Sequence, residues 1–121
     1  MPTPPRLLLV DDEERNLSLL EAYLAPLGCV LTRASGGQEA LPAFEKERPD
    51  LILLDVVMPD LDGLDVLTHI RASEQGSRIP VILITGYTER EERVRGFEAG
   101  ADEFLEKPVD RALLLARVRT L

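Results

Sequence analysis

The sequence predicts an open α/β fold in which a parallel sheet is covered by helices on both faces. Short apolar runs alternate with amphipathic segments five times along the chain, and this alternation is typical of strand–helix units in a parallel sheet. The runs at 7–10, 51–54 and 81–84 contain no alternating polar residues. Strands of this kind are buried on both faces, so we expect right-handed crossovers that place helices on each side.

Five strands and five helices are expected in alternation. The strands are predicted at 7–10, 29–34, 51–54, 81–84 and 103–106. The helices are predicted at 14–27, from 35 toward 47, around 64–70, at 89–99 and from 110 to the end. Apolar residues at helical spacing support the helices, and Gly28 and Gly100 mark the ends of the first and the fourth.

Three local features bear on this assignment. Ser35 and Gln38 stand three residues apart and resemble a capping box at the start of the second helix. Pro42 falls inside the same helix, where it should cause a kink or a late start. Cys29, the single cysteine, is expected to begin the second strand as a small buried residue rather than as a reactive thiol.

The composition indicates one acidic globular domain. The 121 residues suit a single domain, and 45% of them are apolar, which suffices for a sizeable core. The net charge of -8 argues against a nucleic-acid surface and against binding to anionic membranes. One cysteine permits no internal disulfide, and no apolar stretch is long enough to cross a bilayer. We expect a cytoplasmic protein with a disordered, proline-rich lead-in at 1–5 and a domain at 6–121.

Reactive polar residues stand where the apolar strands end. In an open parallel sheet, binding and catalysis occur beyond the carboxyl ends of the strands. The residues at these ends are Asp11, Asp12, Asp55, Thr85, Lys107 and Pro108. The second strand ends in Ala34 and Ser35, which offer no comparable group. The sequence therefore predicts one functional edge, supplied by four of the five strands.

Three carboxylates at one edge predict a bound cation. Like charges within a few ångströms disfavour full ionisation of the group. A hard divalent ion such as Mg²⁺, or Mn²⁺ in its place, relieves this repulsion and leaves coordination positions for phosphate oxygens. Lys107 supplies a compact positive charge, and Thr85 supplies a hydroxyl donor. This set suits phosphoryl transfer to a carboxylate, which forms an aspartyl-phosphate.

The same residues also have ordinary structural interpretations. Asp12, followed by Glu13 and Glu14, could cap a helix. Thr85 could be a β-branched strand residue, and Lys107 a solvated lysine. Their occurrence together at the predicted edge is more specific than any one of them, and it favours the functional interpretation.

Four segments resemble the receiver domain of bacterial two-component response regulators. They are LLLVDDEERN at 7–16, LILLDVVMPDLDG at 51–63, VILITG at 81–86 and GADEFLEKP at 100–108. Their order and spacing match that family across nearly the whole chain. The resemblance implies a flavodoxin-like fold with five parallel strands in the order 2-1-3-4-5, an order that periodicity alone does not give.

The resemblance implies a role for each residue of the acidic edge. Asp55 would be the phosphoacceptor. Asp12 would bind Mg²⁺ directly, and Asp11 would help directly or through water. The main-chain carbonyl of Val57 would be a further ligand. Gly63 would open the turn into the third helix.

Further residues match the parts of the family that hold the phosphoryl group and respond to it. Lys107 would contact the phosphoryl group, and its peptide bond to Pro108 would be cis. Thr85 would hydrogen-bond the phosphoryl group and move on activation, and Gly86 would leave room for access. Phe104 occupies the position of the switch aromatic.

The implied mechanism is a shift between two populations. A sensor histidine kinase, a phosphotransfer protein or a small phosphodonor would phosphorylate Asp55. Thr85 and Phe104 would then move, and the surface of the fourth helix, fifth strand and fifth helix would change its affinity for a partner. Such a domain assists its own phosphorylation and dephosphorylation but is a signalling module rather than a metabolic enzyme. Apolar Val57 and bulky Tyr87 beside the site indicate slow self-dephosphorylation, because neither orients water as a base.

The last helix suggests contacts beyond this domain. Five apolar residues of it cover an arc of roughly 200° at about 100° per residue, namely Leu113, Leu114, Leu115, Val118 and Leu121. They could form a wide core face, a homodimer face or the start of a helix that continues into an output domain beyond Leu121. We expect an excised N-terminal domain of a longer regulator, and the ending LLLARVRTL resembles receivers joined to cyclic-dinucleotide output domains.

Three other functions compete with this interpretation. A degenerate receiver would bind partners without phosphorylation, although the motif residues are present. A Mg²⁺-dependent phosphohydrolase would also use an aspartate nucleophile, but the haloacid-dehalogenase type carries Asp-x-Asp after its first strand, whereas Asp11 and Asp12 are adjacent here. A nucleotide-binding protein would need a glycine-rich loop at that position.

Overall fold

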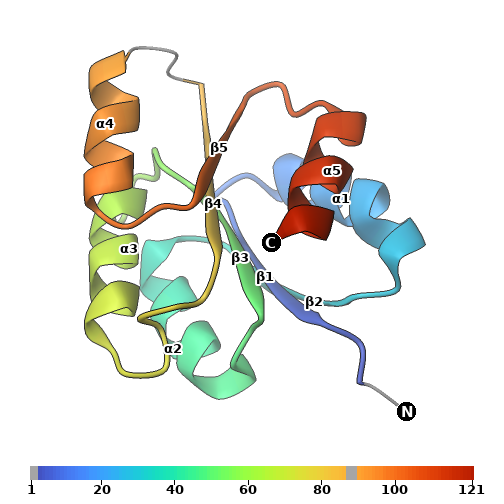
Figure 1. Cartoon of the computed structure of the whole chain (residues 1–121), viewed down its shortest axis with the longest axis horizontal. Helices are drawn as coiled ribbons and strands as arrows, with labels where there is room; N and C mark the ends of the chain where they lie inside the picture. The colour runs from blue at the N-terminus through green and yellow to red at the C-terminus, as the bar shows by residue number, and fades with distance from the viewer. Residues whose placement is uncertain (1–2, 87–89) are drawn as a thin grey trace.

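The computed structural model describes residues 3–86 and 90–121, which form a five-stranded sheet between two layers of helices (Figure 1). The strands are β1 (Arg6–Val10), β2 (Val30–Ala34), β3 (Leu51–Asp55), β4 (Val81–Thr85) and β5 (Glu103–Glu106). The helices are α1 (Glu14–Leu24), α2 (Gly37–Glu47), α3 (Gly63–Ala72), α4 (Arg90–Glu98) and α5 (Arg111–Thr120), and a short 3-10 helix, η1 (Ala25–Leu27), follows α1. None of the described helices has the length and apolar character needed to cross a membrane.

All neighbouring strands run parallel, in the order β2-β1-β3-β4-β5. The predicted fold class is therefore confirmed, including the strand order that the family resemblance implies. Helices α1 and α5 cover one face of the sheet, and α2, α3 and α4 cover the other (Figure 1). The carboxyl ends of β1, β3, β4 and β5 consequently lie along one edge of the sheet.

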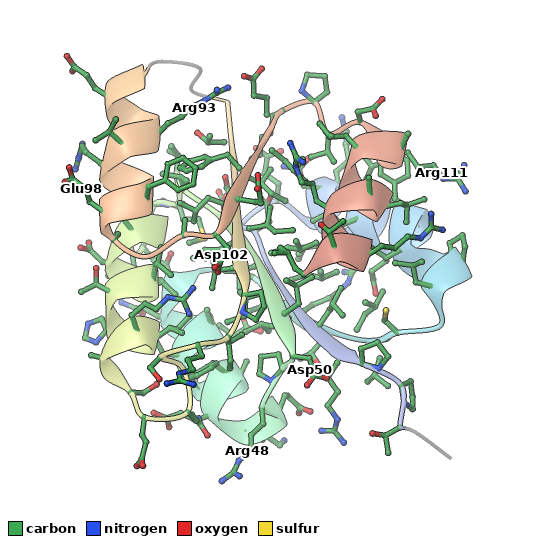
Figure 2. All side chains as sticks on the ribbon, in the orientation of Figure 1. Arg48, Asp50, Arg93, Glu98, Asp102 and Arg111 are labelled. Atoms are coloured by element: carbon green, nitrogen blue, oxygen red, sulfur yellow. The ribbon has the colours of Figure 1, made fainter. Side chains whose placement is uncertain are left out.

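Successive residues of a strand contribute to different cores. Leu8 belongs to the apolar cluster beneath α2 and α3, whereas Leu9 belongs to the cluster beneath α1 and α5. Every residue of β3 and β4 is buried, which explains why their sequences show no polar alternation. Side chains fill the space between the helices and the sheet, and charged side chains such as Glu98 and Arg111 extend outward (Figure 2).

The first helix ends earlier than the sequence predicts. The expected helix over 14–27 divides into α1 and η1. Pro26 has no N–H to donate to the helical ladder, so the chain continues only as a tighter 3-10 turn. Gly28 ends this turn with a φ of 67°, a left-handed conformation that glycine adopts without steric cost.

The expected capping box at the start of α2 is wrong. The residue at the capping position is Gly36, which has no side chain that could bond to the helix. The Asp60 carboxylate takes this role from a distant part of the chain, because it accepts hydrogen bonds from Gly37 N at 3.1 Å and Gln38 N at 3.0 Å. Pro42 lies inside α2, so the helix continues through the proline.

The second strand begins one residue later than expected, at Val30. Cys29 precedes it and is half-buried rather than buried. Burial raises the pKa of the Cys29 thiol, which disfavours the reactive thiolate. In the expected lead-in at 1–5, the carbonyl of Pro5 accepts a hydrogen bond from Val30 N at 2.9 Å, and residues 1–2 lie outside the described part of the chain.

The last two helices differ in how closely they follow the prediction. Helix α4 ends at Glu98 rather than 99. The hypothesis of slow dephosphorylation also involves Tyr87, which lies outside the described residues. The start of α5 is confirmed, because the Asp110 carboxylate accepts a hydrogen bond from Leu113 N at 2.8 Å. Of the five apolar residues singled out there, Leu114 is buried, while Leu113 is 41% exposed and Leu121 45% exposed.

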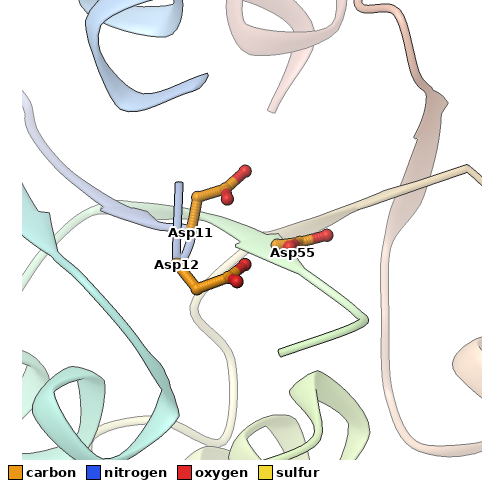
Figure 3. Close-up of side chains that lie close together, drawn as sticks. All are labelled: Asp11, Asp12 and Asp55. Atoms are coloured by element: carbon orange, nitrogen blue, oxygen red, sulfur yellow. The ribbon is translucent and has the colours of Figure 1, made fainter. Parts of the chain in front are cut away.

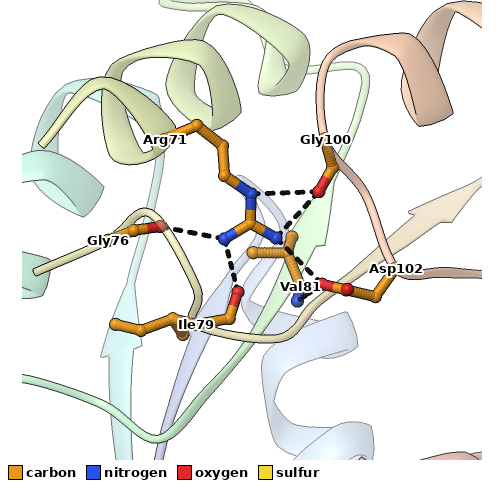
Figure 4. A network of polar contacts seen from close by, with 6 residues as sticks. All are labelled: Arg71, Gly76, Ile79, Val81, Gly100 and Asp102. Atoms are coloured by element: carbon orange, nitrogen blue, oxygen red, sulfur yellow. Dashed lines mark hydrogen bonds and ion pairs between the residues drawn. The ribbon is translucent and has the colours of Figure 1, made fainter. Parts of the chain in front are cut away.

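A single arginine joins the connections at the opposite edge of the sheet (Figure 4). The Arg71 guanidinium donates hydrogen bonds to the carbonyls of Gly76, Ile79 and Gly100. It also pairs with Asp102 at 2.8 Å, and the same Asp102 carboxylate accepts a hydrogen bond from Val81 N at 2.8 Å. Arg71 therefore joins α3 to the α3–β4 and α4–β5 connections.

Candidate functional site

Three carboxylates converge at the carboxyl edge of the sheet (Figure 3). One oxygen from each of Asp11, Asp12 and Asp55 lies within 4.8 Å of the others. Asp11 and Asp55 are each 2% exposed, whereas Asp12 is exposed. The predicted meeting of these three carboxylates is confirmed.

The strand register brings two of these carboxylates side by side. Val10 of β1 pairs with Leu54 of β3, so the residues that follow each of them, Asp11 and Asp55, stand at the same level of neighbouring strands. Asp11 N extends the ladder by donating to the Ala34 carbonyl at 3.2 Å. Burial at this level follows from the helices that cover both faces of the sheet.

The local structure argues against an ordinary capping role for Asp12. The residue that precedes α1 is Glu13, whose side chain makes no capping hydrogen bond. The Asp11 carboxylate instead accepts a hydrogen bond from Glu13 N at 2.9 Å. This bond fixes the orientation of Asp11 and leaves the Asp12 carboxylate available to the cluster.

Lys107 provides a positive charge beside the carboxylates. Its Nζ lies 3.1 Å from Asp55 Oδ1 and 3.6 Å from Asp11 Oδ2. The main chain fixes this residue at the sheet edge, because Lys107 N donates to the Thr85 carbonyl at 2.9 Å. The peptide bond between Lys107 and Pro108 is cis, in agreement with what the family resemblance implies.

The charges of the cluster shift its pKa values. Burial, followed by the charge of Asp11, raises the pKa of Asp55 to about 6, although the hydrogen bond and charge of Lys107 act in the opposite direction. For Lys107, burial lowers the pKa, but the hydrogen bond and charge of Asp55 outweigh it and the pKa is raised overall. The lysine therefore stays protonated and offsets only part of the repulsion between the acids.

An open pocket of about 630 Å³ gives access to Asp55. Its lining includes Asp12, Val57, Gly86 and Lys107. Among the described residues, a Cβ added to Gly86 would meet no heavy atom within 4 Å, so the expected need for a small residue here stays a prediction. Thr85 is buried at the end of β4, with 2% exposure. The pocket therefore reaches the Asp55 carboxylate from the molecular surface.

The loop at 56–62, between β3 and α3, is anchored against the strand end. Helix α3 begins at Gly63, whose N–H donates to the Val56 carbonyl at 2.8 Å. A Cβ on Gly63 would overlap the Asp55 carbonyl and lie 2.8 Å from Val56 Cα, so only glycine fits this close approach. Asp62 caps α3 by accepting a hydrogen bond from Leu64 N at 2.8 Å.

Comparison with known proteins identifies the family. A family model described as the response regulator receiver domain matches residues 7–119. The chain belongs to this family. The receiver domain is 44% identical over 116 residues to response regulator PleD of Caulobacter vibrioides. The aligned region covers 96% of this chain and 26% of that protein.

Two further relatives agree with this assignment. The transcriptional regulatory protein PrrA of Mycobacterium tuberculosis is 43% identical over 119 residues, which covers 98% of this receiver domain and 50% of that protein. The crystal structure of a response regulator receiver protein from Pseudomonas putida is similar with a TM-score of 0.91 and 34% identity, and the match covers 100% of both chains. The receiver domain thus spans between a quarter and a half of the length of PleD and PrrA.

A second region of the receiver domain contains the predicted switch residue. Phe104 of β5 is half-buried and packs edge-to-face on Phe97 of α4, with ring centroids 5.0 Å apart and an interplanar angle of 67°. A Cβ on Gly96 would overlap the Phe104 ring. A surface pocket of about 430 Å³ adjoins Phe104 and extends toward Leu113 of α5.

One residue at the functional edge was not singled out from the sequence. Asp60 joins the 56–62 loop to α2, and its third hydrogen bond comes from Leu61 N at 2.9 Å. The hydrogen bond from Gln38 N is the largest cause that holds the pKa of Asp60 below its ordinary value. The only local sequence signal is the adjacent Gly36 and Gly37, which leave the first turn of α2 without a capping side chain.

Proposed function

We propose that this receiver domain is a cytoplasmic signalling module in which Asp55 accepts a phosphoryl group with the help of Mg²⁺. The observation that carries the proposal is the pairing of Lys107 Nζ with Asp55 Oδ1 at 3.1 Å, beside the carboxylates of Asp11 and Asp12. A buried carboxylate that has both a cationic partner and a cation site is suited to form an acyl phosphate, because the negative charge of the incoming group is offset on two sides.

The donor set fits Mg²⁺ or Mn²⁺. Three carboxylates within 4.8 Å of one another are hard oxygen ligands, which these ions prefer and which leave positions for water and phosphate oxygens. Asp11, Asp12 and Asp55 would hold the ion together with the main-chain carbonyl of Val57, a residue that lines the pocket containing Asp12 and Asp55. When bound, the ion supplies charge neutralisation at the phosphoryl oxygens.

The residues of the chain supply the remaining chemistry. A carboxylate oxygen of Asp55 attacks the phosphorus of a phosphohistidine on a sensor histidine kinase or phosphotransfer protein. The phosphorus–nitrogen bond breaks, and the departing imidazole takes a proton from solvent. Lys107 and the Thr85 hydroxyl hold the oxygens of the transferred group. Because the pKa of Asp55 is about 6, its nucleophilic carboxylate form predominates at neutral pH.

The phosphorylated state would differ at the surface formed by α4, β5 and α5. Thr85 would follow the new phosphoryl group, and Phe104 would leave its packing against Phe97. This change would alter the affinity of the surface for a partner, an output domain beyond Leu121 or a second copy of the chain. PleD and PrrA both extend well beyond the matched region, which supports an output domain as the first of these targets.

The phosphoryl group should be lost slowly. Val57 is 54% exposed and lines the pocket that leads to Asp55. An apolar side chain at this place offers no group to orient a water molecule for attack on the acyl phosphate. A phosphoryl lifetime of only seconds in the isolated domain would contradict this part of the proposal.

Phosphorylation by a small donor tests the proposal. The purified domain is incubated with acetyl phosphate and Mg²⁺, and its intact mass is measured. We expect wild type and the Asp65→Asn control, which removes an exposed charge, to gain one phosphoryl group, and Asp55→Asn to gain none. Wild type should also stay unlabelled when EDTA replaces Mg²⁺. An unmodified wild type would favour a degenerate receiver, and rapid turnover of small phosphate esters would favour a phosphohydrolase.

A further inference from the structure

Two sets of hydrogen bonds hold the 56–62 loop. Gly63 N bonds to the Val56 carbonyl at 2.8 Å and so joins the two ends of the loop. Within the loop, the Asp60 carboxylate accepts hydrogen bonds from Gly37 N and Gln38 N in the first turn of α2. Val57, whose carbonyl is the proposed main-chain ligand, lies between these attachments in the sequence. The place of that carbonyl therefore depends on how firmly both are held.

The contact between the 56–62 loop and the start of α2 is closely packed. A Cβ on Gly36 would come within 2.8 Å of Asp60 Oδ2, and one on Gly37 within 2.6 Å of Leu61 Cβ. A Cβ on Gly37 would also lie 2.8 Å from the Leu61 carbonyl oxygen, so a side chain there would force the loop away from the helix, whereas one at Gly36 would displace the Asp60 carboxylate. The two glycines thus let the loop approach α2 closely enough for the carboxylate to reach both N–H groups.

We propose that Asp60 is a positioning residue for the metal site: it joins the 56–62 loop to α2 and thereby sets the place of the Val57 carbonyl. This inference rests on the proposed function, because it requires that the carbonyl bind the ion. Asp60 does not touch the ion in this scheme. It acts as the outer partner of a ligand, and such partners commonly tune metal affinity.

The chemistry of the contact suits this role. A carboxylate at a helix N-terminus accepts charge-assisted hydrogen bonds from N–H groups that have no partner within the helix. The lowered pKa of Asp60 keeps the carboxylate ionised at neutral pH. Thermodynamic coupling is reciprocal, so an ion that binds the loop should in turn strengthen the contact between Asp60 and α2.

Metal affinity provides the first test. The dissociation constant of Mg²⁺ is measured by calorimetry for wild type, Asp60→Ala, Asp60→Asn and Asp65→Asn, with circular dichroism to verify folding. We expect binding to weaken by about tenfold in Asp60→Ala. Asp60→Asn, which keeps one acceptor oxygen, should fall between it and wild type. Asp65→Asn removes an exposed charge in the first turn of α3 and should bind like wild type.

Hydrogen exchange provides a readout that a purely structural role would not move. In wild type, Mg²⁺ should slow exchange of the Gly37 and Gln38 amides, and in Asp60→Ala this effect of Mg²⁺ should disappear. The wild-type measurement decides the matter even if Asp60→Ala does not fold. Equal Mg²⁺ affinity in folded Asp60→Ala and wild type, or wild-type amides that ignore Mg²⁺, would overturn the inference alone. A wild type that binds no Mg²⁺ would overturn the proposed metal site together with it.

Discussion

The ammonium group of Lys107 is within ion-pair distance of two carboxylates, at 3.1 Å from Asp55 and 3.6 Å from Asp11. This one cation faces a cluster that also contains Asp12. The compensation is incomplete, because the pKa of Asp55 stays raised to about 6. The metal-free domain therefore carries an electrostatic cost at its functional edge, and the first two predictions follow from it.

Removal of the Asp55 charge should stabilise the metal-free domain at neutral pH. The pKa of Asp55 is raised from 3.8 to about 6, so the folded state holds this proton more tightly than the unfolded state. The contribution of this bound proton to the free energy of unfolding is full below the pKa of the unfolded state. It is lost as the pH rises through the pKa of the folded state. The shift corresponds to as much as about 3 kcal/mol. Urea unfolding of wild type and Asp55→Asn in EDTA should give curves that separate as the pH rises through about 4 to 7. A gap that stays constant with pH would contradict the assignment.

Mg²⁺ should stabilise wild type in a pH-dependent way. An ion that binds only the folded state adds about 2.7 kcal/mol at one hundred times its dissociation constant. Protons compete for Asp55, so Mg²⁺ affinity should fall as the pH is lowered through about 6. Thermal melts with and without Mg²⁺ measure the effect, and Asp12→Asn should reduce it. A melting temperature that does not respond to Mg²⁺ at neutral pH would exclude the site.

Alanine at Gly63 should be far more disruptive than alanine at Gly86. A Cβ on Gly63 would overlap the Asp55 carbonyl, and relief of this clash requires main-chain movement that costs about 1–3 kcal/mol or more. Among the described residues, the matched change at Gly86 meets no heavy atom within 4 Å, and it should alter stability by less than about 0.5 kcal/mol. Chemical unfolding of the two variants makes the comparison. Equal stabilities would mean that the loop is not packed as described.

Alanine at Gly96 should displace the Phe104 ring. Helix propensity alone would favour alanine by about 1 kcal/mol, but its Cβ would overlap the ring of Phe104. Overpacking of this kind commonly costs about 1–3 kcal/mol, so we expect a net loss of stability and altered aromatic side-chain NMR signals for Phe97 and Phe104. A stabilised Gly96→Ala variant with unchanged ring signals would show that α4 and β5 are less closely packed.

Loss of Arg71 should destabilise the fold without affecting the acidic cluster directly. Arg71→Ala would leave the carbonyls of Gly76, Ile79 and Gly100 without this donor and Asp102 without its ion pair. Loss of the donor to the partly buried carbonyls costs about 1–3 kcal/mol, and the ion pair adds little because the Asp102 side chain is 42% exposed. Arg78, which is exposed, serves as the control, and Arg78→Ala should change stability by less than about 0.5 kcal/mol. Similar unfolding midpoints for the two variants would contradict the role of Arg71.

The sequence predicts the fold well because burial on both faces leaves a direct mark on composition. The runs in β3 and β4 are wholly apolar since helices cover each side of them. The strand order has no such mark and came from the family resemblance. The start of a helix was predicted correctly where its capping residue is the adjacent one, as at Asp110. The prediction failed at Ser35, because the group that caps that helix comes from a distant part of the chain. No local pattern indicates that Asp60 caps α2 from the loop after β3.

The acidic cluster could be predicted because strand ends share an edge in a parallel sheet. That rule predicts from the sequence alone that Asp11, Asp12, Asp55 and Lys107 lie together, and their observed distances agree. The repulsion from Asp11 that helps to raise the pKa of Asp55 was expected, but burial, the largest cause of the shift, could not be predicted because it depends on how the helices close around the edge. The structural role of Arg71 could not be predicted from the sequence for a related reason. Its partners are mostly main-chain carbonyls, and every residue type carries that group.

The hydrogen bonds of Arg71 also define a part of the domain that can serve as a reference when conformational change is measured. The guanidinium ties the α3–β4 and α4–β5 connections together at the end of the sheet remote from Asp55. Because these bonds hold both connections, we expect residues near Arg71 to move less on phosphorylation than the surface formed by α4, β5 and α5. A spectroscopic label at the exposed Ser77 would then serve as a fixed reference for distances to a second label on α4.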